Sequence, residues 1–128
     1  MIEEPATIPP GLKVELSRSK VLPGRSGEAD EWMQMLNDRV DECVATLDRE
    51  RMALEIAFRL EEDGVEYLYW VSIYGVGGEG LDVSIPIDRD HELMARRAKE
   101  PGWVEAVPQF LLLPQPVRDA IEAWSLRG

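Results

Sequence analysis

Basic charge is scarce in this chain, and the shortage excludes whole classes of partner. The sequence has 14 lysine and arginine residues against 25 aspartate and glutamate residues, which gives a net charge of −11. Such a charge repels phosphate backbones and anionic lipids, and no basic stripe with interleaved aromatic residues counters it. We therefore expect no nucleic-acid partner and no membrane partner.

Cysteine and long apolar runs are nearly absent as well. The single cysteine, Cys43, rules out an intrachain disulfide and a cysteine-rich zinc site. Cys43 falls in an amphipathic helix pattern, which favours a small buried side chain over a nucleophile. No charged-then-apolar signal peptide opens the chain, and no apolar run approaches the roughly 18 residues of a transmembrane helix. These features indicate a protein of the reducing cytoplasm.

The length and composition suit one folded domain. The chain has 128 residues, of which 45% are hydrophobic. Residues 1–12 contain three prolines and a glycine, which predicts an irregular N-terminal segment. No internal repeat or long linker follows, so we predict a single domain over residues 13–128.

The spacing of apolar residues predicts an alternation of strands and helices. Alternation at every second residue indicates strands, and three- and four-residue spacing indicates helices. Strands are expected at 13–21, 52–60, 65–74 and 110–113, and helices at 26–49, from 88 or 90 to about 99, and from 116 onward. Asp63-Gly64 is a hairpin signal between the second and third strands. This order predicts an α+β, ferredoxin-like βαββαβ sandwich, in which a four-stranded antiparallel sheet carries helices on one face and a C-terminal helix is added.

The third predicted strand is apolar on both sides, so one face of the sheet needs a cover besides the helices. We expect the set that includes Tyr67, Tyr69 and Val71 to face the helices. Leu68 and Trp70 would then lie on the opposite face, which does not resemble a fully solvated surface. A second copy of the chain, or a ligand, should cover it, and we favour a homodimer.

A glycine-rich segment, residues 75–80, matches the pattern G-x-G-x-x-G. A dinucleotide site needs a helix directly after this motif, but the next residues favour an extended chain and lead to Pro86. Glu79 would also place a negative charge among the phosphates. The segment is therefore expected to be a flexible loop, which could act as a lid over a pocket.

His91 is the only histidine and the best candidate for acid–base chemistry near neutral pH. Asp88 and Asp90 precede it, so the same residues could instead start a helix, with an aspartate as its cap. A metal site would need a further ligand, such as Glu55 or Glu92. The sequence leaves these three readings open.

Two charged residues interrupt predicted strands. Arg18 continues the apolar face of the first strand, where it could pair with Glu42 or Glu50 or bind a small carboxylate. Glu55 lies between two small residues, which could leave room for a ligand or for a partner subunit.

Several short segments together resemble a known family of small bacterial proteins. The set comprises Ser17-Arg18-x-Lys20-x-x-Pro23-Gly24, Trp32, Thr46-Leu47-x-x-Glu50, Glu55-x-x-Phe58, Tyr67-Leu68-Tyr69 and Asp88-x-x-His91. The family is functionally uncharacterised and similar in architecture to the dimeric α/β-barrel superfamily of ferredoxin-like proteins. The resemblance covers about residues 14–113 and implies this fold and a homodimer, but no established activity. Barrel relatives include cofactor-free monooxygenases, haem-degrading enzymes, isomerases and binding proteins, so the fold does not choose among them.

Three functional hypotheses follow. The first is a homodimer that binds a small organic ligand between sheet and helices. The candidate contacts are Arg18, Glu55, Tyr69, Trp70, Asp88 and His91. The second is a cofactor-independent isomerase or monooxygenase with His91 or Glu55 as general base. The third is an assembly module that uses the open sheet face. No cofactor is expected, since the only histidine lies in an acidic stretch that would repel haem propionates.

Overall fold

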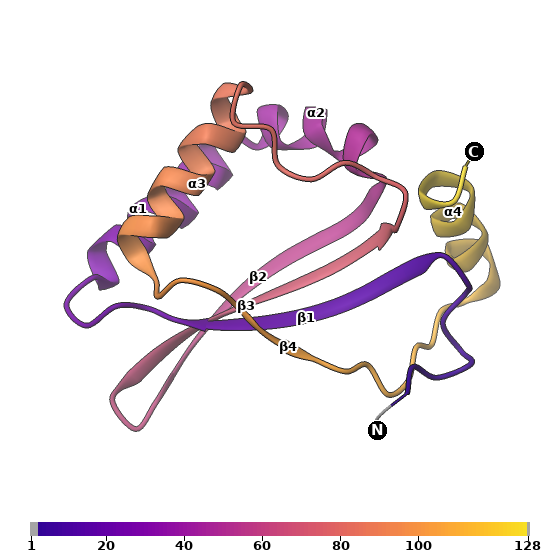
Figure 1. The fold of residues 1–128 in the computed structure, drawn as a ribbon, viewed down its shortest axis with the longest axis horizontal. Coiled ribbons are helices and arrows are strands. Elements are labelled where there is room, and N and C mark those ends of the chain that lie inside the picture. Colours follow the sequence, from indigo (N-terminus) through magenta and orange to yellow (C-terminus); the bar gives the residue numbers. More distant parts are fainter. Residues whose placement is uncertain (1–2, 128) are drawn as a thin grey trace.

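The fold is an antiparallel sheet with helices packed above it (Figure 1). The computed structural model describes residues 3–127. Its elements, in chain order, are β1 (Leu12–Lys20), α1 (Ser26–Asp38), α2 (Val40–Glu50), β2 (Met52–Glu62), β3 (Val65–Gly75), α3 (Pro86–Ala98), β4 (Val104–Ala106) and α4 (Gln115–Ser125). The strands lie in the order β2-β3-β1-β4, and each neighbouring pair is antiparallel. The predicted α+β class and the four-stranded antiparallel sheet are confirmed.

The hairpin between β2 and β3 forms where the sequence predicts it. Asp63 and Gly64 have φ angles of 52° and 79°. Two successive positive φ angles are the requirement of the two-residue turn that best matches the twist of paired strands. The pairing runs from Glu62 opposite Val65 to Leu54 opposite Ile73. This long hairpin forms half of the sheet and carries most of the residues discussed below.

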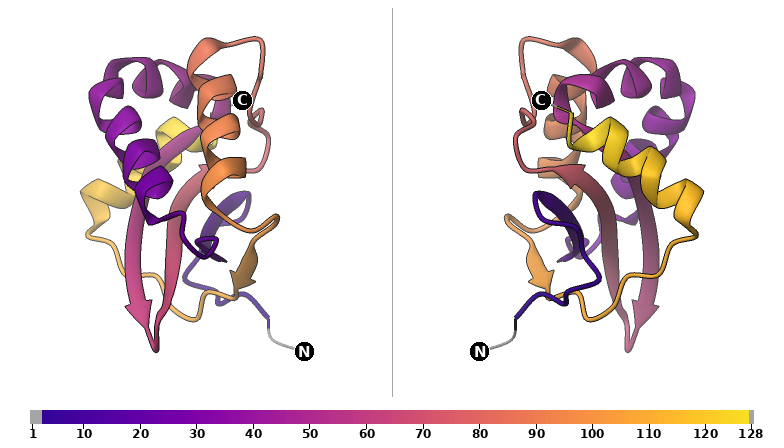
Figure 2. Two further views of the ribbon diagram at one scale, coloured as in Figure 1. Left: turned by 90° about the vertical axis from the view of Figure 1, so that its left-hand side faces the viewer. Right: turned by 90° about the vertical axis from the view of Figure 1, so that its right-hand side faces the viewer.

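The single helix predicted over residues 26–49 is wrong, because the helix breaks at Arg39 and continues as α2. Arg39 has φ −113° and ψ 34°, outside the helical region. Neither proline nor glycine marks the break. The Arg39 guanidinium bonds Asp90 of α3 at 2.7 Å and Glu42 of α2 at 2.6 Å, so it holds the corner from both sides. After the corner, α1 lies beside α3 while α2 turns away across the sheet (Figures 1 and 2).

The fourth strand was predicted at 110–113, but the structure forms it at Val104–Ala106. This short strand pairs with β1 between Leu16 and Arg18. In the predicted segment only Leu111 turns into the core, and its backbone N–H bonds the Thr7 hydroxyl instead of a strand. Prolines at both ends remove backbone donors there, which explains why the apolar run does not join the sheet.

The two faces of β3 are also exchanged relative to the prediction. Leu68 is fully buried against the helices, and Trp70 packs beside it. Tyr67, Tyr69 and Val71 therefore point to the opposite face. Alternation along a strand shows which residues share a face but not which face a helix covers, and both sets of β3 are apolar. Which face of β3 is covered depends on the side chains of α1 and α3 that pack against it.

The interior consists of two apolar clusters at opposite ends of the sheet. One lies beneath α1 and α3 and centres on Trp32, Leu68 and Ala98. The other centres on Leu12 and Ile73 at the end covered by α4. Residues 3–11 form neither helix nor strand, yet Ile8 belongs to this second cluster. By the alternation of β3, Leu68 and Ile73 lie on opposite faces, so α4 covers one end of the face that α1 and α3 leave free. On the face beneath α1 and α3, the helices and the sheet leave space over the middle of β2 and β3.

Candidate functional site

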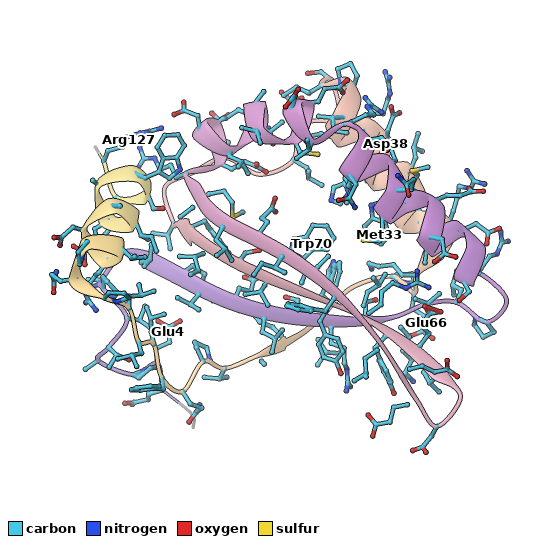
Figure 3. The ribbon with its side chains drawn as sticks, turned by 180° about the vertical axis from the view of Figure 1, so that it is seen from behind. Glu4, Met33, Asp38, Glu66, Trp70 and Arg127 are labelled. Carbon is cyan, nitrogen blue, oxygen red and sulfur yellow. The ribbon has the colours of Figure 1, made fainter. Side chains whose placement is uncertain are left out.

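A cleft of about 510 Å³ lies between the helices and the exposed middle of β2 and β3. Figure 3 shows Trp70 rising from the sheet toward α1, with Met33 opposite it. The lining combines an apolar majority with a few polar groups: Met33, Leu36, Asn37, Val40, Cys43, Thr46, Glu50, Glu55, Ile56, Ala57, Arg59, Trp70, Leu81, Ile87, Asp88 and His91. The bend at Arg39 opens this space, because α2 turns away from the direction in which α1 and α3 run side by side.

Three aromatic rings pack together at one side of the cleft, where Trp70 and His91 line the space and Trp32 is buried behind them. Trp70 stacks on Trp32 with ring centroids 5.9 Å apart, and the His91 ring lies 5.4 Å from each. The Trp32 indole N–H donates a hydrogen bond of 2.8 Å to Nδ1 of His91. An acceptor Nδ1 has no proton, so the proton of the neutral ring is on Nε2. Burial lowers the pKa of His91, which keeps the ring neutral at neutral pH.

Nε2 of His91 is therefore the ring atom that remains available to a bound molecule. Within residues 3–127, no protein group hydrogen-bonds it. Since His91 lines the cleft, it can offer one uncharged N–H donor there. The helix-start position predicted for His91 is close to the observed one, since the residue lies in the second turn of α3.

Glu55 is the most perturbed carboxyl group of the cleft. Burial between the cleft walls, together with the nearby carboxylate of Glu50, raises its pKa to about 7. The Glu55 side chain also keeps surface that is open to water in the cleft. The Trp70 indole N–H approaches Glu55 at 3.4 Å, a long hydrogen bond that opposes the shift. Near neutral pH, Glu55 can thus either accept or donate a proton.

Asp88 is structural rather than available for a ligand. Its carboxylate is buried, accepts a hydrogen bond of 3.0 Å from Arg49 and another of 2.9 Å from the backbone N–H of Asp82. Arg49 also bonds the Gly80 carbonyl at 2.6 Å. Asp88 and Arg49 therefore join α2, α3 and the glycine-rich segment at one end of the cleft.

The glycine-rich segment is docked against the protein at two points. A Cβ on Gly75 would lie 1.8 Å from the Ser125 carbonyl oxygen, and one on Gly78 would lie 2.1 Å from the Glu50 carbonyl oxygen. Only glycine permits such close backbone approach. The glycines thus serve packing against α2 and α4, and Leu81 beyond them lines the cleft.

The structure brings together four of the six predicted site residues. Glu55, Trp70, Asp88 and His91 all line the cleft. Arg18 and Tyr69 pair across β1 and β3 on the opposite face of the sheet. No ion pair joins Arg18 to an acidic residue in residues 3–127. The Arg18 guanidinium instead lies over the ring of Tyr67, 4.8 Å from the centroid.

Nothing in the sequence indicated that Trp32 orients His91. Spacing along the chain holds no signal for this contact, because 59 residues separate the two. Cys43 lines the cleft too, and burial raises the pKa of its thiol, so it stays protonated. The described part of the chain contains no group of three His, Cys, Asp or Glu side chains placed to hold a metal ion, and none of its helices is long and apolar enough to cross a membrane.

The sequence comparison assigns the chain to a family through almost all of this structure. Residues 12–119 match the model of DUF6176, described as a family of unknown function. The chain belongs to this family. The match begins at β1 and ends within α4, so the DUF6176 domain contains every residue that lines the cleft. No curated protein and no solved structure matches the chain.

We expect Glu55→Gln to stabilise the protein at pH 8 and to have a much smaller effect at pH 5. The pKa is raised from 4.5 to about 7 on folding, so the stability that the bound proton contributes is complete below pH 4.5 and lost as the pH rises through 7. Because the group is partly open to water, we expect a gain of about 1 kcal/mol at pH 8. Urea unfolding at both pH values measures it.

The matched control is Glu61→Gln, the same change at an exposed site of β2. His91 acts in the opposite direction, since the stability due to its lowered pKa is present above 6.5 and lost as the pH falls. His91 contributes equally to the stability of the variant and of the wild type at any one pH, so its contribution cancels in the comparison. An equal gain at pH 5 and pH 8 would contradict the raised pKa of Glu55.

Proposed function

We propose that this DUF6176 domain binds a small organic molecule in the cleft between the sheet and the helices. The observation that carries the proposal is the cleft itself, at about 510 Å³ and mostly apolar in lining. Ligand sites of proteins are typically concavities of about 300–1,000 Å³ in which a few polar groups fix orientation. Here Glu55 and the Nε2 proton of His91 are the polar groups, and Trp70 supplies a flat apolar surface.

Thermal-shift screening of a metabolite collection tests this function. We expect some compounds to raise the melting temperature of the wild type but not of Ala57→Phe, which fills the cleft from the sheet. Ala45→Phe is the matched control, because Ala45 is exposed on α2 and outside the lining. Binding at 100 times the dissociation constant stabilises a protein by about 2.7 kcal/mol. If every compound acts equally on wild type and Ala57→Phe, the cleft is not the site.

We further propose that the domain is a ferredoxin-like homodimer of the dimeric α/β-barrel type that works in the cytoplasm. The order of strands and helices and the bacterial family resemblance support the architecture, and the single cysteine supports a reducing compartment. The face opposite α1 and α3, here called the open sheet face, supports the dimer. It contains Leu16, Phe58, Leu60, Tyr67, Tyr69 and Val71.

An apolar surface of this kind needs a cover. Phe58 and Leu60 of the open sheet face are 53% and 48% exposed. Side chains of Leu60 and Tyr67, and of Phe58 and Tyr69, form cross-strand rows that a second copy can meet with the same rows. A twofold axis brings identical patches together, so one apolar patch per chain is sufficient for a closed dimer.

Phe58→Glu should convert the dimer into a monomer. A carboxylate at the centre of an apolar interface would be buried without a partner, which costs several kcal/mol. Light scattering after size-exclusion chromatography gives the mass directly. Val44→Glu is the control, since Val44 is equally exposed but lies on α2, away from the open sheet face. A wild type that is already monomeric would disprove the dimer.

A second candidate function is acid–base catalysis without a cofactor, and one observation favours it. Glu55 has a pKa of about 7 and shares the cleft with a neutral His91, an arrangement that can move a proton and stabilise a developing oxyanion. For a compound that binds, deuterium exchange from solvent into the ligand, followed by NMR, tests the idea. Loss of exchange in Glu55→Gln with unchanged binding would support it, and exchange at the wild-type rate would exclude Glu55 as the base.

A further inference from the structure

We propose that the molecule bound in the cleft is a small organic cation, an amine on an apolar body, held between Glu55 and the ring of Trp70. The inference rests on the proposed ligand-binding function and adds the chemical class of the ligand. It comes from which charges of the cleft already have partners and which do not.

The three carboxylates of the cleft differ in their partners. Asp88 accepts hydrogen bonds from Arg49 and from a backbone N–H, so it needs no partner from a ligand. Glu50 lies 3.0 Å from the Thr46 hydroxyl, but the Cys43 carbonyl, at 2.8 Å, competes for the single proton of that hydroxyl. Glu50 therefore adds negative charge beside Glu55.

Glu55 has no cationic partner within residues 3–127. Its hydrogen-bond contact is the long one from the Trp70 indole. Arg59 lies on the same strand and faces the same side, but its guanidinium pairs with Asp30 and Glu66 outside the cleft. The ionisable groups around Glu55 on the other elements are Cys43 and Glu50 of α2 and Asp88 and His91 of α3.

None of these neighbours supplies a positive charge. The Cys43 thiol is protonated and His91 is neutral, for the reasons given above. Arg59 is the cation among the residues that line the cleft, and it already pairs with Asp30 and Glu66. Within residues 3–127, an ionised Glu55 therefore lacks an ion-pair partner, and a cationic ligand would provide the counter-charge. An anionic ligand would meet uncompensated carboxylates, which cost several kcal/mol when desolvated.

The aromatic side of the cleft favours the same kind of ligand. A cation over the face of a tryptophan gains about 0.5–2 kcal/mol, the largest value among the aromatic residues. Trp70 is held in place by Trp32 stacked 5.9 Å away, so little ordering is needed on binding. Met33 and Leu36 add apolar surface for the body of the amine.

Three probes of one shape separate charge from shape: benzylamine, benzyl alcohol and benzoate. We expect calorimetry at pH 8 to show binding of benzylamine at least about tenfold tighter than of benzyl alcohol, with benzoate weakest. Binding of the amine should weaken by about tenfold from pH 8 to pH 6, because Glu55 becomes protonated across its pKa of about 7. Benzylamine itself stays protonated over this range.

Variants assign the effect to the proposed groups. Glu55→Gln should remove the preference for benzylamine over benzyl alcohol together with the pH dependence, and Glu61→Gln should keep both. Ala57→Phe should abolish binding of all three probes. An amine preference that survives in Glu55→Gln would overturn the inference.

The outcomes distinguish this inference from the function on which it rests. If benzyl alcohol or benzoate binds as tightly as the amine and Ala57→Phe blocks it, the cleft binds ligands but not cations as a class, and the inference fails alone. If no probe and no compound of the metabolite collection distinguishes the wild type from Ala57→Phe, both fail. Benzylamine binding that requires Glu55 and an open cleft supports both.

Discussion

Trp32→Ala should lower the free energy of unfolding by about 3–5 kcal/mol, the largest single-residue effect we expect in this protein. Trp32 is fully buried between α1, α3 and the sheet, in the cluster that contains Leu68 and Ala98. Removing the indole leaves a large cavity, ends the stacking on Trp70 and deprives His91 of its hydrogen-bond donor. Denaturant unfolding measures the loss.

Trp103→Ala is the natural control, because Trp103 touches the edge of Trp70 but is 41% exposed. We expect it to cost about 1 kcal/mol or less, since little apolar area leaves the core. A Trp32→Ala variant within 1 kcal/mol of the wild type would show that this cluster does not hold the helices to the sheet.

Trp32→Phe separates packing from the hydrogen bond. The phenyl ring keeps most of the apolar contact but cannot donate to Nδ1 of His91. We expect the Nδ1 proton to appear on part of the population of His91, which nitrogen-15 NMR of the single imidazole would resolve. An unchanged Nε2 tautomer would mean that another group sets the protonation of His91.

Asp88→Ala should have the second largest effect, a loss of about 2–3 kcal/mol. The carboxylate is 4% exposed and holds Arg49 and the backbone N–H of Asp82, so its removal leaves two donors without an acceptor. Arg49 keeps its bond to the Gly80 carbonyl and can reach water, which keeps the loss below that of a fully buried pair. Chemical denaturation, with hydrogen exchange at residues 79–82, measures both consequences.

Asp90→Ala provides the comparison on the same helix. Asp90 pairs with Arg39, but the pair is solvated, so the loss should be much smaller than that of Asp88→Ala. In the Asp88→Ala background, Arg49→Met should recover part of the lost stability, because it removes a charge whose remaining ion pair is the long one of 3.7 Å to the exposed Glu79. Equal losses for Asp88→Ala and Asp90→Ala would contradict the structural role assigned to Asp88.

The sequence was most informative where the pattern is local. The hairpin at Asp63-Gly64 needed two positive φ angles that glycine and aspartate tolerate, and the paired strands on either side follow from alternation. α4 begins at Gln115 with Pro116 in its first turn, as the missing proline N–H allows. Such features depend on residues within one turn or one strand, so no distant contact can change them much.

The errors arose where distant contacts decide. At the end of α1 the Arg39 side chain is bound by Asp90, 51 residues later, as well as by Glu42, and neither proline nor glycine marks the break in the sequence. Val104–Ala106, not the more apolar run after it, became β4 because Leu16–Arg18 offered a free edge there. In both cases a contact distant in sequence outweighed local propensity.

The candidate site shows the same division. Residue type alone indicated His91, Glu55 and Trp70, since a single histidine and polar groups on apolar strands are rare and chemically distinctive. Arg18 and Tyr69 were grouped with them because the wrong face of β3 was assigned to the helices. The unpaired state of Glu55 could not be inferred at all, because it depends on Arg59 being held by Asp30 and Glu66.

By itself the sequence determined the α+β class, the long hairpin, the low basic charge and the residue types able to do chemistry. These follow from periodicity, turn stereochemistry and composition, which act within a few residues. Only the tertiary structure decided that the helix bends at Arg39 and which face of β3 the helices cover. It also decided which charged side chains of the cleft lack a partner. Those outcomes depend on side chains that meet across as many as 59 residues, and no local pattern encodes which of them will meet.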